Sequence, residues 1–228
     1  AALCDVNPDR QALAEDLGIP FFSDYREMID QAGLEGVIDG TPNQFHAEVG
    51  MYCAGKGIHV LTEKPITSTL EEGKRLVEAV EESGISLLVG HHRRYYPLIR
   101  RAREIVQGGE LGQLVGISML WALMKPDVYF EVAWRSQKGG GPILINIIHE
   151  MDNLRFICGD VAEISASARR LVRSGEVEDT VSIRFELVGG ALGAPCDRDD
   201  PGFGRVAAAG TTRRRVEPQV GQPELPVG

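Results

Sequence analysis

Short apolar runs alternate with longer amphipathic stretches through the first ninety residues. The runs lie at 2–6, 36–40, 58–61 and 85–89. Each run has the length of a strand, and the stretches between the runs carry apolar side chains at helical spacing. The alternation predicts parallel strands joined by crossover helices, with 36–40 as a short buried strand.

Residues that favour helix ends mark the first of these boundaries. Asn7-Pro8 combines an N-cap residue with proline at the first helical position, and Gly18 is a typical helix stop. Leu13 and Leu17 lie four residues apart, on one face of the predicted helix.

The pattern changes after Gly90, where predicted strands become longer and helices fewer. The predicted elements are a basic amphipathic helix at 96–106, a long strand at 111–123, a Trp-, Arg- and Gly-rich loop at 129–141, an apolar helix at 142–158, and strands at 161–172 and 180–188. This order predicts a second domain of α+β type with an antiparallel sheet.

Composition favours a globular protein that acts on small molecules. The 228 residues are 43% hydrophobic and 25% charged, and the net charge of -9 with scattered basic residues argues against nucleic-acid binding. No apolar run approaches the roughly 20 residues that cross a bilayer, so no membrane association is expected. The widely spaced Cys4, Cys53, Cys158 and Cys196 form no CxxC pair, which predicts reduced thiols and a cytoplasmic location.

Glu63-Lys64-Pro65 follows an apolar run and precedes a predicted helix. It therefore places a lysine at a strand-to-helix turn, where open α/β sheets hold ligands. Shielding from water lowers the pKa of a lysine and lets it exchange a proton with a substrate. On these three residues alone, a solvated loop lysine is the alternative.

Six stretches in the same order resemble the Gfo/Idh/MocA family of nicotinamide-dependent sugar and polyol dehydrogenases. They are Asp5-Val6-Asn7-Pro8-Asp9-Arg10, Thr41-Pro42-Asn43 with His46, Glu63-Lys64-Pro65, Val89-Gly90-His91-His92-Arg93-Arg94, Gly139-Gly140-Gly141 and His149-Glu150-Met151-Asp152. The resemblance covers about residues 1–193. It implies an α/β fold, with an incomplete Rossmann-type parallel sheet followed by an α+β domain with a mainly antiparallel sheet.

The resemblance also divides the chain. Residues 1–92 correspond to a partial dinucleotide-binding domain that lacks its first βα unit and the GxGxxG turn, and 93–193 to an incomplete substrate and oligomerisation domain. Residues 194–228 mix proline, glycine and charge without period and are expected to be disordered. Within them 202–207 matches GxGxxA, but no apolar strand precedes it, so we reject it as a dinucleotide site.

The expected cofactor is NAD. Asp5 ends a predicted strand, where a carboxylate can accept both ribose hydroxyls of an adenosine. Arg10 lies nearby and could accept a 2′-phosphate, so NADP stays open. The resemblance places further cofactor contacts at Thr41, Pro42, Asn43, His46, Glu63, Lys64 and His92, although Thr41 and Asn43 are also ordinary N-cap residues.

Candidate substrate residues lie mainly in the second domain. Asn146, His149 and Asp152 are spaced by three on an apolar helix, so they share one face and need polar partners, of which a substrate hydroxyl is one. A structural role for a buried histidine is the alternative. The resemblance adds Lys64 at the substrate hydroxyl and a sugar pocket bordered by Arg94, Tyr129, Trp134 and Arg135.

One departure from the family affects the mechanism. Many members carry an aspartate four residues before this histidine, but Ile145 stands here. Lys64 and His149 are therefore the expected catalytic residues. No metal is expected, because the neighbouring His91 and His92 point to opposite faces of an extended segment.

The sequence thus predicts an oxidoreductase that transfers a hydride between NAD and a hydroxyl or carbonyl carbon of a sugar, cyclitol or related polyol. The partners are a small-molecule substrate and, in a complete protein, further copies in a homo-oligomer. A catalytically silent remnant or a sugar-binding regulatory module is the alternative.

Overall fold

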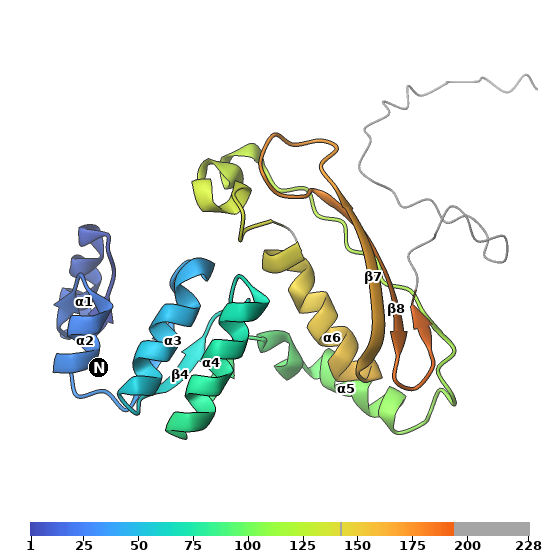
Figure 1. Ribbon diagram of the computed structural model, residues 1–228, viewed down its shortest axis with the longest axis horizontal. Helices are drawn as coiled ribbons and strands as arrows, with labels where there is room; N and C mark the ends of the chain where they lie inside the picture. Colours follow the sequence, from blue (N-terminus) through green and yellow to red (C-terminus); the bar gives the residue numbers. More distant parts are fainter. Residues whose placement is uncertain (142, 194–228) are drawn as a thin grey trace, which may run out of the picture.

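The computed structural model describes residues 1–141 and 143–193, with helix-covered parallel strands in the first half and a mixed sheet in the second (Figure 1). The first half contains β1 (Leu3–Cys4), α1 (Gln11–Leu17), β2 (Phe21–Phe22), α2 (Tyr25–Gln31), β3 (Gly36–Asp39), α3 (His46–Gly55), β4 (His59–Thr62), α4 (Leu70–Ser83) and β5 (Leu87–Val89). The second half contains α5 (Pro97–Gln107), β6 (Gly116–Ile117), α6 (Ile148–Cys158), β7 (Val161–Arg169), β8 (Thr180–Leu187) and β9 (Leu192–Gly193). Short helices are η1 (Pro8–Arg10), η2 (Asn43–Phe45), η3 (His92–Tyr95), η4 (Asp127–Glu131), η5 (Ala133–Ser136) and the π-helical turn η6 (Ile143–Ile147).

The predicted fold class is confirmed, because parallel strands with crossover helices precede a mainly antiparallel sheet. The predicted tail at 194–228, with its GxGxxA match, lies outside the described residues. Among the described residues, no helix combines the length and the apolar character needed to cross a membrane.

β1 and β2 form a parallel pair of their own, with α1 as the crossover between them and α2 after β2. The Asn7 side chain accepts the N–H of Asp9 at 3.0 Å, and Gly18 adopts φ 65° as the C-cap, as predicted. Leu13 and Leu17 are nevertheless 46% and 60% exposed, so this face of α1 is largely uncovered. A two-stranded sheet is too narrow to cover the whole helix, and only Ala14 of α1 is buried.

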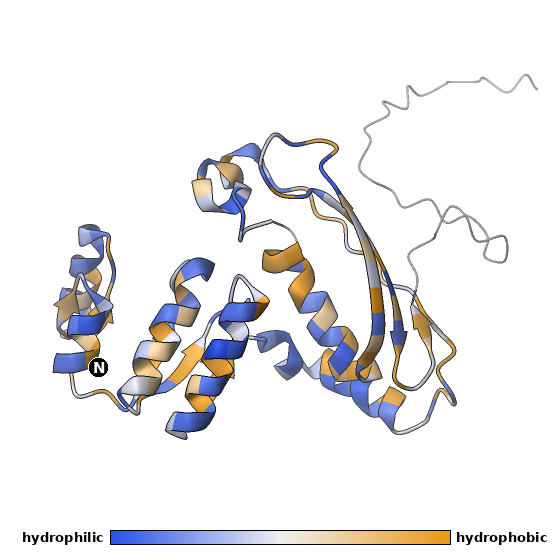
Figure 2. Ribbon diagram, viewed as in Figure 1, coloured by the Kyte–Doolittle hydropathy of each residue, from blue (hydrophilic) through white to orange (hydrophobic). Residues whose placement is uncertain are grey.

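β3, β4 and β5 form a parallel sheet with α3 and α4 packed on one face. Figure 2 shows apolar residues concentrated on β4, between helices with polar outer faces. Val37 and Val60 face the helices and are buried. The next residues in register, Ile38, Leu61 and Leu88, face the other way and are 81%, 38% and 63% exposed. The predicted buried strand at 36–40 is thus present as β3 but buried on one face only, because in the described part of the chain the helices cover that side.

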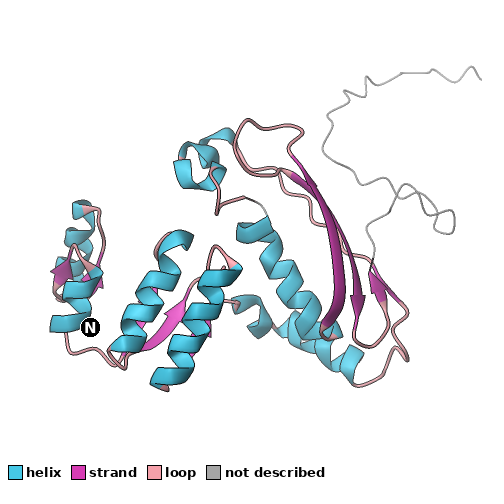
Figure 3. Ribbon diagram, viewed as in Figure 1, coloured by secondary structure: helices cyan, strands magenta, loops and turns pink. Residues whose placement is uncertain are grey.

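The second sheet has the order β6-β9-β8-β7, and Leu154 of α6 packs on Phe185 and Leu187 of β8. The predicted strands at 161–172 and 180–188 correspond to β7 and β8. The predicted long strand at 111–123 is wrong, since only the two residues of β6 pair with β9 and the rest is mostly loop (Figure 3). β9, the partner of β6 among the described residues, is itself two residues long, so it pairs with no more of this segment.

Asp179 closes the connection between β7 and β8. Its carboxylate accepts the N–H groups of Leu171, Val172 and Arg173 at 2.8–3.1 Å and the hydroxyl of Thr180 at 2.9 Å. Partial burial would raise the pKa of Asp179, but these donors outweigh burial and lower the pKa to about 2.

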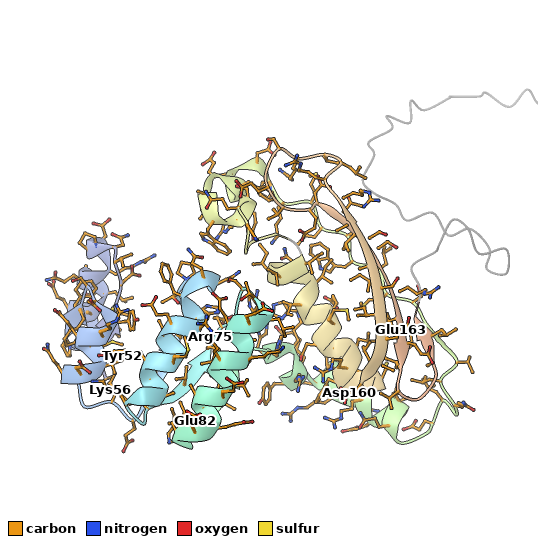
Figure 4. All side chains as sticks on the ribbon, viewed as in Figure 1. Tyr52, Lys56, Arg75, Glu82, Asp160 and Glu163 are labelled. Carbon is orange, nitrogen blue, oxygen red and sulfur yellow. The ribbon has the colours of Figure 1, made fainter. Side chains whose placement is uncertain are left out.

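We expect Asp179→Ala to lower the free energy of unfolding by about 1 kcal/mol at pH 7, after allowance for solvent screening. The folded pKa lies below the unfolded value of about 3.9, so the contribution is present above pH 4 and is lost as the pH falls towards 2. Urea unfolding of both proteins across this pH range measures the difference. Glu163→Ala, at an exposed residue of β7 (Figure 4), is the control and should have little effect. An equal loss in both variants, or a loss that persists at pH 2, would contradict this account.

Candidate functional site

The candidate site lies at the carboxyl ends of β3, β4 and β5. The residues that follow these strands are Thr41–Asn43, Glu63–Lys64 and His91–His92. Because parallel strands end at the same edge of a sheet, the three turns lie side by side. α6 and the turn before it close the site from the second half of the chain.

Lys64 connects the two halves directly. Its Nζ donates a hydrogen bond of 2.8 Å to the backbone carbonyl oxygen of Ile145 in η6. Burial lowers the pKa of Lys64, and the positive charges of Arg93 and Lys125 lower it further, whereas Glu63 opposes them. The amine is therefore held in place by a neutral acceptor and is easier to deprotonate than a solvated lysine.

His149 projects from α6 into the same region and is 7% exposed. Its ring centroid lies 5.2 Å from that of His92 and 6.2 Å from that of His91. Burial lowers the pKa of His149 to about 4, with further contributions from the charges of Lys64, Arg93, His92 and His91. The ring is therefore neutral at pH 7 and can accept or donate a hydrogen bond.

Two ion pairs join η3 to α6 beside the histidines. The Arg94 guanidinium donates to both carboxylate oxygens of Asp152, through Nε at 2.8 and 3.0 Å and also through Nη2. Arg93 pairs with Glu150, and His91 Nδ1 lies 3.8 Å from Asp152. Arg94 and Asp152, expected at the substrate, are thus bound to each other and fix the position of His149.

β3 ends on Asp39, which was not among the predicted site residues. Asp39 is 2% exposed, and its carboxylate accepts the N–H of Thr41 at 3.0 Å and the Thr41 hydroxyl at 2.7 Å. His46 is also buried, with its ring nitrogens 2.7 Å from the carbonyl oxygen of Pro65 and 2.8 Å from that of Thr41. His46 therefore holds two turns together. An acid at the end of a buried strand, just before Gly40, was the available signal for Asp39.

Asn43 ties the glycine run to this turn. Its side-chain amide donates to the carbonyl oxygen of Gly139 at 3.1 Å, and Pro42 is the N-cap of η2. Gly139 and Gly141 adopt φ 94° and 90°, and a Cβ at Gly140 would collide with the backbone of the preceding loop. The glycines thus allow the loop to turn tightly against the ends of the strands.

The remaining predicted substrate residues lie on the loop before the glycines and on η6. The Arg135 guanidinium stacks 4.1 Å from the ring centroid of Tyr129 and 5.6 Å from that of Trp134, and Nη1 donates to the Tyr129 carbonyl at 3.1 Å. Asn146 is half-buried in η6, next to Ile145.

Asp5 and Arg10 lie apart from this cluster, at the end of β1 and in η1. The Asp5 carboxylate accepts the N–H of Asn7 at 2.8 Å and lies 4.0 Å from Arg10 Nε. Its side chain is 39% exposed, so lone pairs remain for a ligand.

The arrangement fits a dinucleotide with a hydroxylated substrate beside it. The carboxylates of Asp5 and Glu63 follow parallel strands, as ribose-binding acids do. The buried atoms Ser68 Oγ, His91 Nδ1 and His149 Nδ1 have no hydrogen-bond partner among the described residues, so a polar ligand would satisfy them. Within 1–141 and 143–193, no group of three His, Cys, Asp or Glu side chains is placed to hold a metal ion.

Comparison with known proteins matches both halves of the chain. Residues 1–91 match the family model GFO_IDH_MocA, described as an oxidoreductase family with an NAD-binding Rossmann fold. Residues 99–195 match the model of the GFO/IDH/MocA C-terminal domain.

Relatives and solved structures agree with these matches. Levoglucosan dehydrogenase of Pseudarthrobacter phenanthrenivorans is 27% identical over an alignment of 199 residues. The alignment covers 75% of this chain and 51% of the relative. Myo-inositol 2-dehydrogenase of Thermotoga maritima is 29% identical and aligns over 84% of this chain and 58% of its own length. The WlbA dehydrogenase of Bordetella pertussis, solved with NADH and UDP-GlcNAcA, superposes with a TM-score of 0.78 at 29% identity, covering 84% of this chain and 61% of that one. The chain spans about half the length of the curated relatives it matches.

We expect Lys64→Met to raise the pKa of His149 from about 4 towards its ordinary value, because a nearby positive charge is removed. An NMR titration of the histidine ring protons measures the midpoint. Lys74→Met removes an exposed lysine of α4 and should leave the midpoint unchanged. If Lys64→Met also leaves it unchanged, the two side chains are not electrostatically coupled.

Proposed function

Because this chain belongs to the Gfo/Idh/MocA oxidoreductase family, we propose that it acts as an NAD-dependent dehydrogenase on a hydroxyl-bearing carbon of a sugar, cyclitol or related polyol. The observation that carries the proposal is the Lys64 ammonium, half-buried at the edge of a parallel sheet and facing α6. A basic group in this position can exchange a proton with a substrate hydroxyl while the carbon exchanges a hydride. Relatives that act on levoglucosan and on myo-inositol support this substrate class.

NAD is the proposed coenzyme. When bound, it accepts or donates the hydride. Asp5 would accept the hydroxyls of the adenosine ribose, while Thr41, Asn43 and Glu63 would line the nicotinamide end. Gly90 allows the Glu63 carboxylate to approach, since a Cβ at Gly90 would lie 3.3 Å from it. Pro42, as the N-cap of η2, and His46, whose ring contacts the Thr41 carbonyl, would shape the nicotinamide end of the site. His92 would border the same end, next to His149.

Lys64 would transfer the proton of the substrate hydroxyl, and His149 would position the hydroxyl oxygen. The Ile145 carbonyl orients Lys64 Nζ without adding a negative charge, so the lowered pKa of Lys64 is preserved. In the substrate-oxidising direction, neutral Lys64 would take the hydroxyl proton, and neutral His149 would hold the same oxygen by a hydrogen bond. In the reverse direction the Lys64 ammonium would return the proton to the developing alkoxide.

We also propose a domain boundary near residue 92, with 1–92 for the coenzyme and 93–193 for substrate and self-association. The boundary falls just after β5, in the segment that leads into η3. Self-association through the sheet is supported by β7, where Ile164 is 54% exposed.

We expect the full chain to bind NADH more tightly than NADPH, because a 2′-phosphate would meet the Asp5 carboxylate. Asp5→Ala should weaken NADH binding about tenfold through loss of the ribose hydrogen bonds, and should narrow the preference between the two coenzymes. Fluorescence titration of each coenzyme provides the dissociation constants. Asp9→Ala removes an exposed acid of η1 as the matched control. Tighter binding of NADPH by the unmodified chain would contradict the assignment of Asp5.

We expect Lys64→Met to lower kcat with NAD by about 10²- to 10⁴-fold, as loss of a general acid–base group does, and to leave the Kd of NADH nearly unchanged. Initial rates with myo-inositol, levoglucosan and D-xylose would be compared with those of Lys74→Met, which should be unaffected. A Lys64→Met protein as active as its control would rule out Lys64 as the group that transfers the proton.

A further inference from the structure

Two cations share one aromatic ring on the loop that precedes the glycines. Lys125 Nζ lies 4.7 Å from the ring centroid of Tyr129, and Arg135 Cζ lies 4.1 Å from the same centroid. Among residues 1–141 and 143–193, no carboxylate lies within 4.0 Å of the charged nitrogens of either residue. Two like charges thus lie within 4.7 Å of one ring centroid without a counter-charge in this part of the chain, which is electrostatically unfavourable.

Three arginines of the second half have carboxylate partners. Arg93 pairs with Glu150, Arg94 with Asp152, and Arg173 with Asp127. Lys125 and Arg135 differ from these three arginines, because neither has a carboxylate partner among the described residues.

The acids of the same loop are directed elsewhere. Asp127 lies 3.0 Å from Arg173, and Glu131 is exposed. Glu178, in the connection between β7 and β8, uses one carboxylate oxygen to accept the N–H of Ile143 at 3.0 Å. None of the three therefore offsets the charge at Tyr129.

The loop borders the candidate reaction site. Asn43 bonds to Gly139, and Gly139 lies next to Ser68, whose buried hydroxyl has no partner among the described residues. The charge of Lys125 also reaches Lys64, where it contributes to the lowered pKa. An anionic group held at Tyr129 would therefore belong to a molecule that also extends towards Lys64 and His149.

We propose that Lys125 and Arg135 form an anion-binding subsite and that the substrate is a sugar bearing a carboxylate, such as a uronic acid. The inference rests on the proposed function, since it takes the site to be a sugar site and adds the charge of its substrate. Arg135 uses Nη1 for the Tyr129 carbonyl and keeps Nε and Nη2 for a ligand, while Lys125 offers three donors. Donors of this kind form charge-assisted hydrogen bonds with a carboxylate.

The test compares D-glucuronate with D-glucuronamide, its neutral counterpart of nearly the same shape. Titration calorimetry on the full chain, with and without saturating NADH, gives both dissociation constants. We expect glucuronate to bind about tenfold more tightly, because a charge-assisted hydrogen bond replaces a neutral one. Added salt should reduce the difference.

Three variants locate the effect. Lys125→Met should abolish most of the preference for glucuronate, and Lys125→Arg should retain it. Lys138→Met removes an exposed lysine of the same loop and should leave the preference intact, which controls for net charge. Thermal unfolding of each variant confirms that it is folded.

The outcomes separate this inference from the proposed function. Equal binding of the two sugars, no binding of glucuronate, or a preference that survives Lys125→Met overturns the subsite, even if NADH binds. Tighter binding of glucose 6-phosphate than of glucuronate also overturns it, since the subsite would then suit a phosphate. A Lys125-dependent preference without NADH binding supports the subsite and counts against the dehydrogenase.

Discussion

The hydrogen bond from Lys64 to the carbonyl of Ile145 is the contact on which the site depends. It joins the turn after β4 to the turn that begins α6, so one ammonium group belongs to both halves of the chain. Because the acceptor is a neutral carbonyl, the bond orients the amine without fully stabilising its charge. Burial can then lower the pKa of Lys64, and Lys64 in turn helps to keep His149 neutral. The contact with Ile145 thus sets the position of the amine, whereas burial and the neighbouring charges lower its pKa.

Two ion pairs beside this contact hold α6, the helix that carries His149, in place. Arg93 and Arg94 follow β5, and both are paired with acids of α6. These pairs hold the helix that presents His149 against the segment that carries His91 and His92. Asp152, which the family motif places at the substrate, is bonded to Arg94 in this structure.

Local features of the sequence predicted where helices begin and end. They did not predict which strands pair or which distant side chains bond to each other. Asn7 and Gly18 mark the ends of the first helical segment because capping is local, and the family motifs correctly indicated both domain types. The long strand at 111–123 was wrong because a strand needs a neighbour, and the pattern of one segment does not reveal that β9 is two residues long. The bond between Arg94 and Asp152 spans 58 positions, and no spacing rule reports it. Asp39 was missed although it ends a predicted strand just before Gly40, because its hydrogen bonds to Thr41 appear only once the backbone is folded.

The sheet of β3, β4 and β5 has helices on one side only, and this has a practical consequence. Ile38, Leu61 and Leu88 form an apolar row, in register, on the side that the helices leave uncovered. Apolar patches of this kind adhere to other apolar surfaces in water. Handling the purified chain therefore calls for dilute samples and mild solubilising additives, and light scattering should accompany every binding measurement.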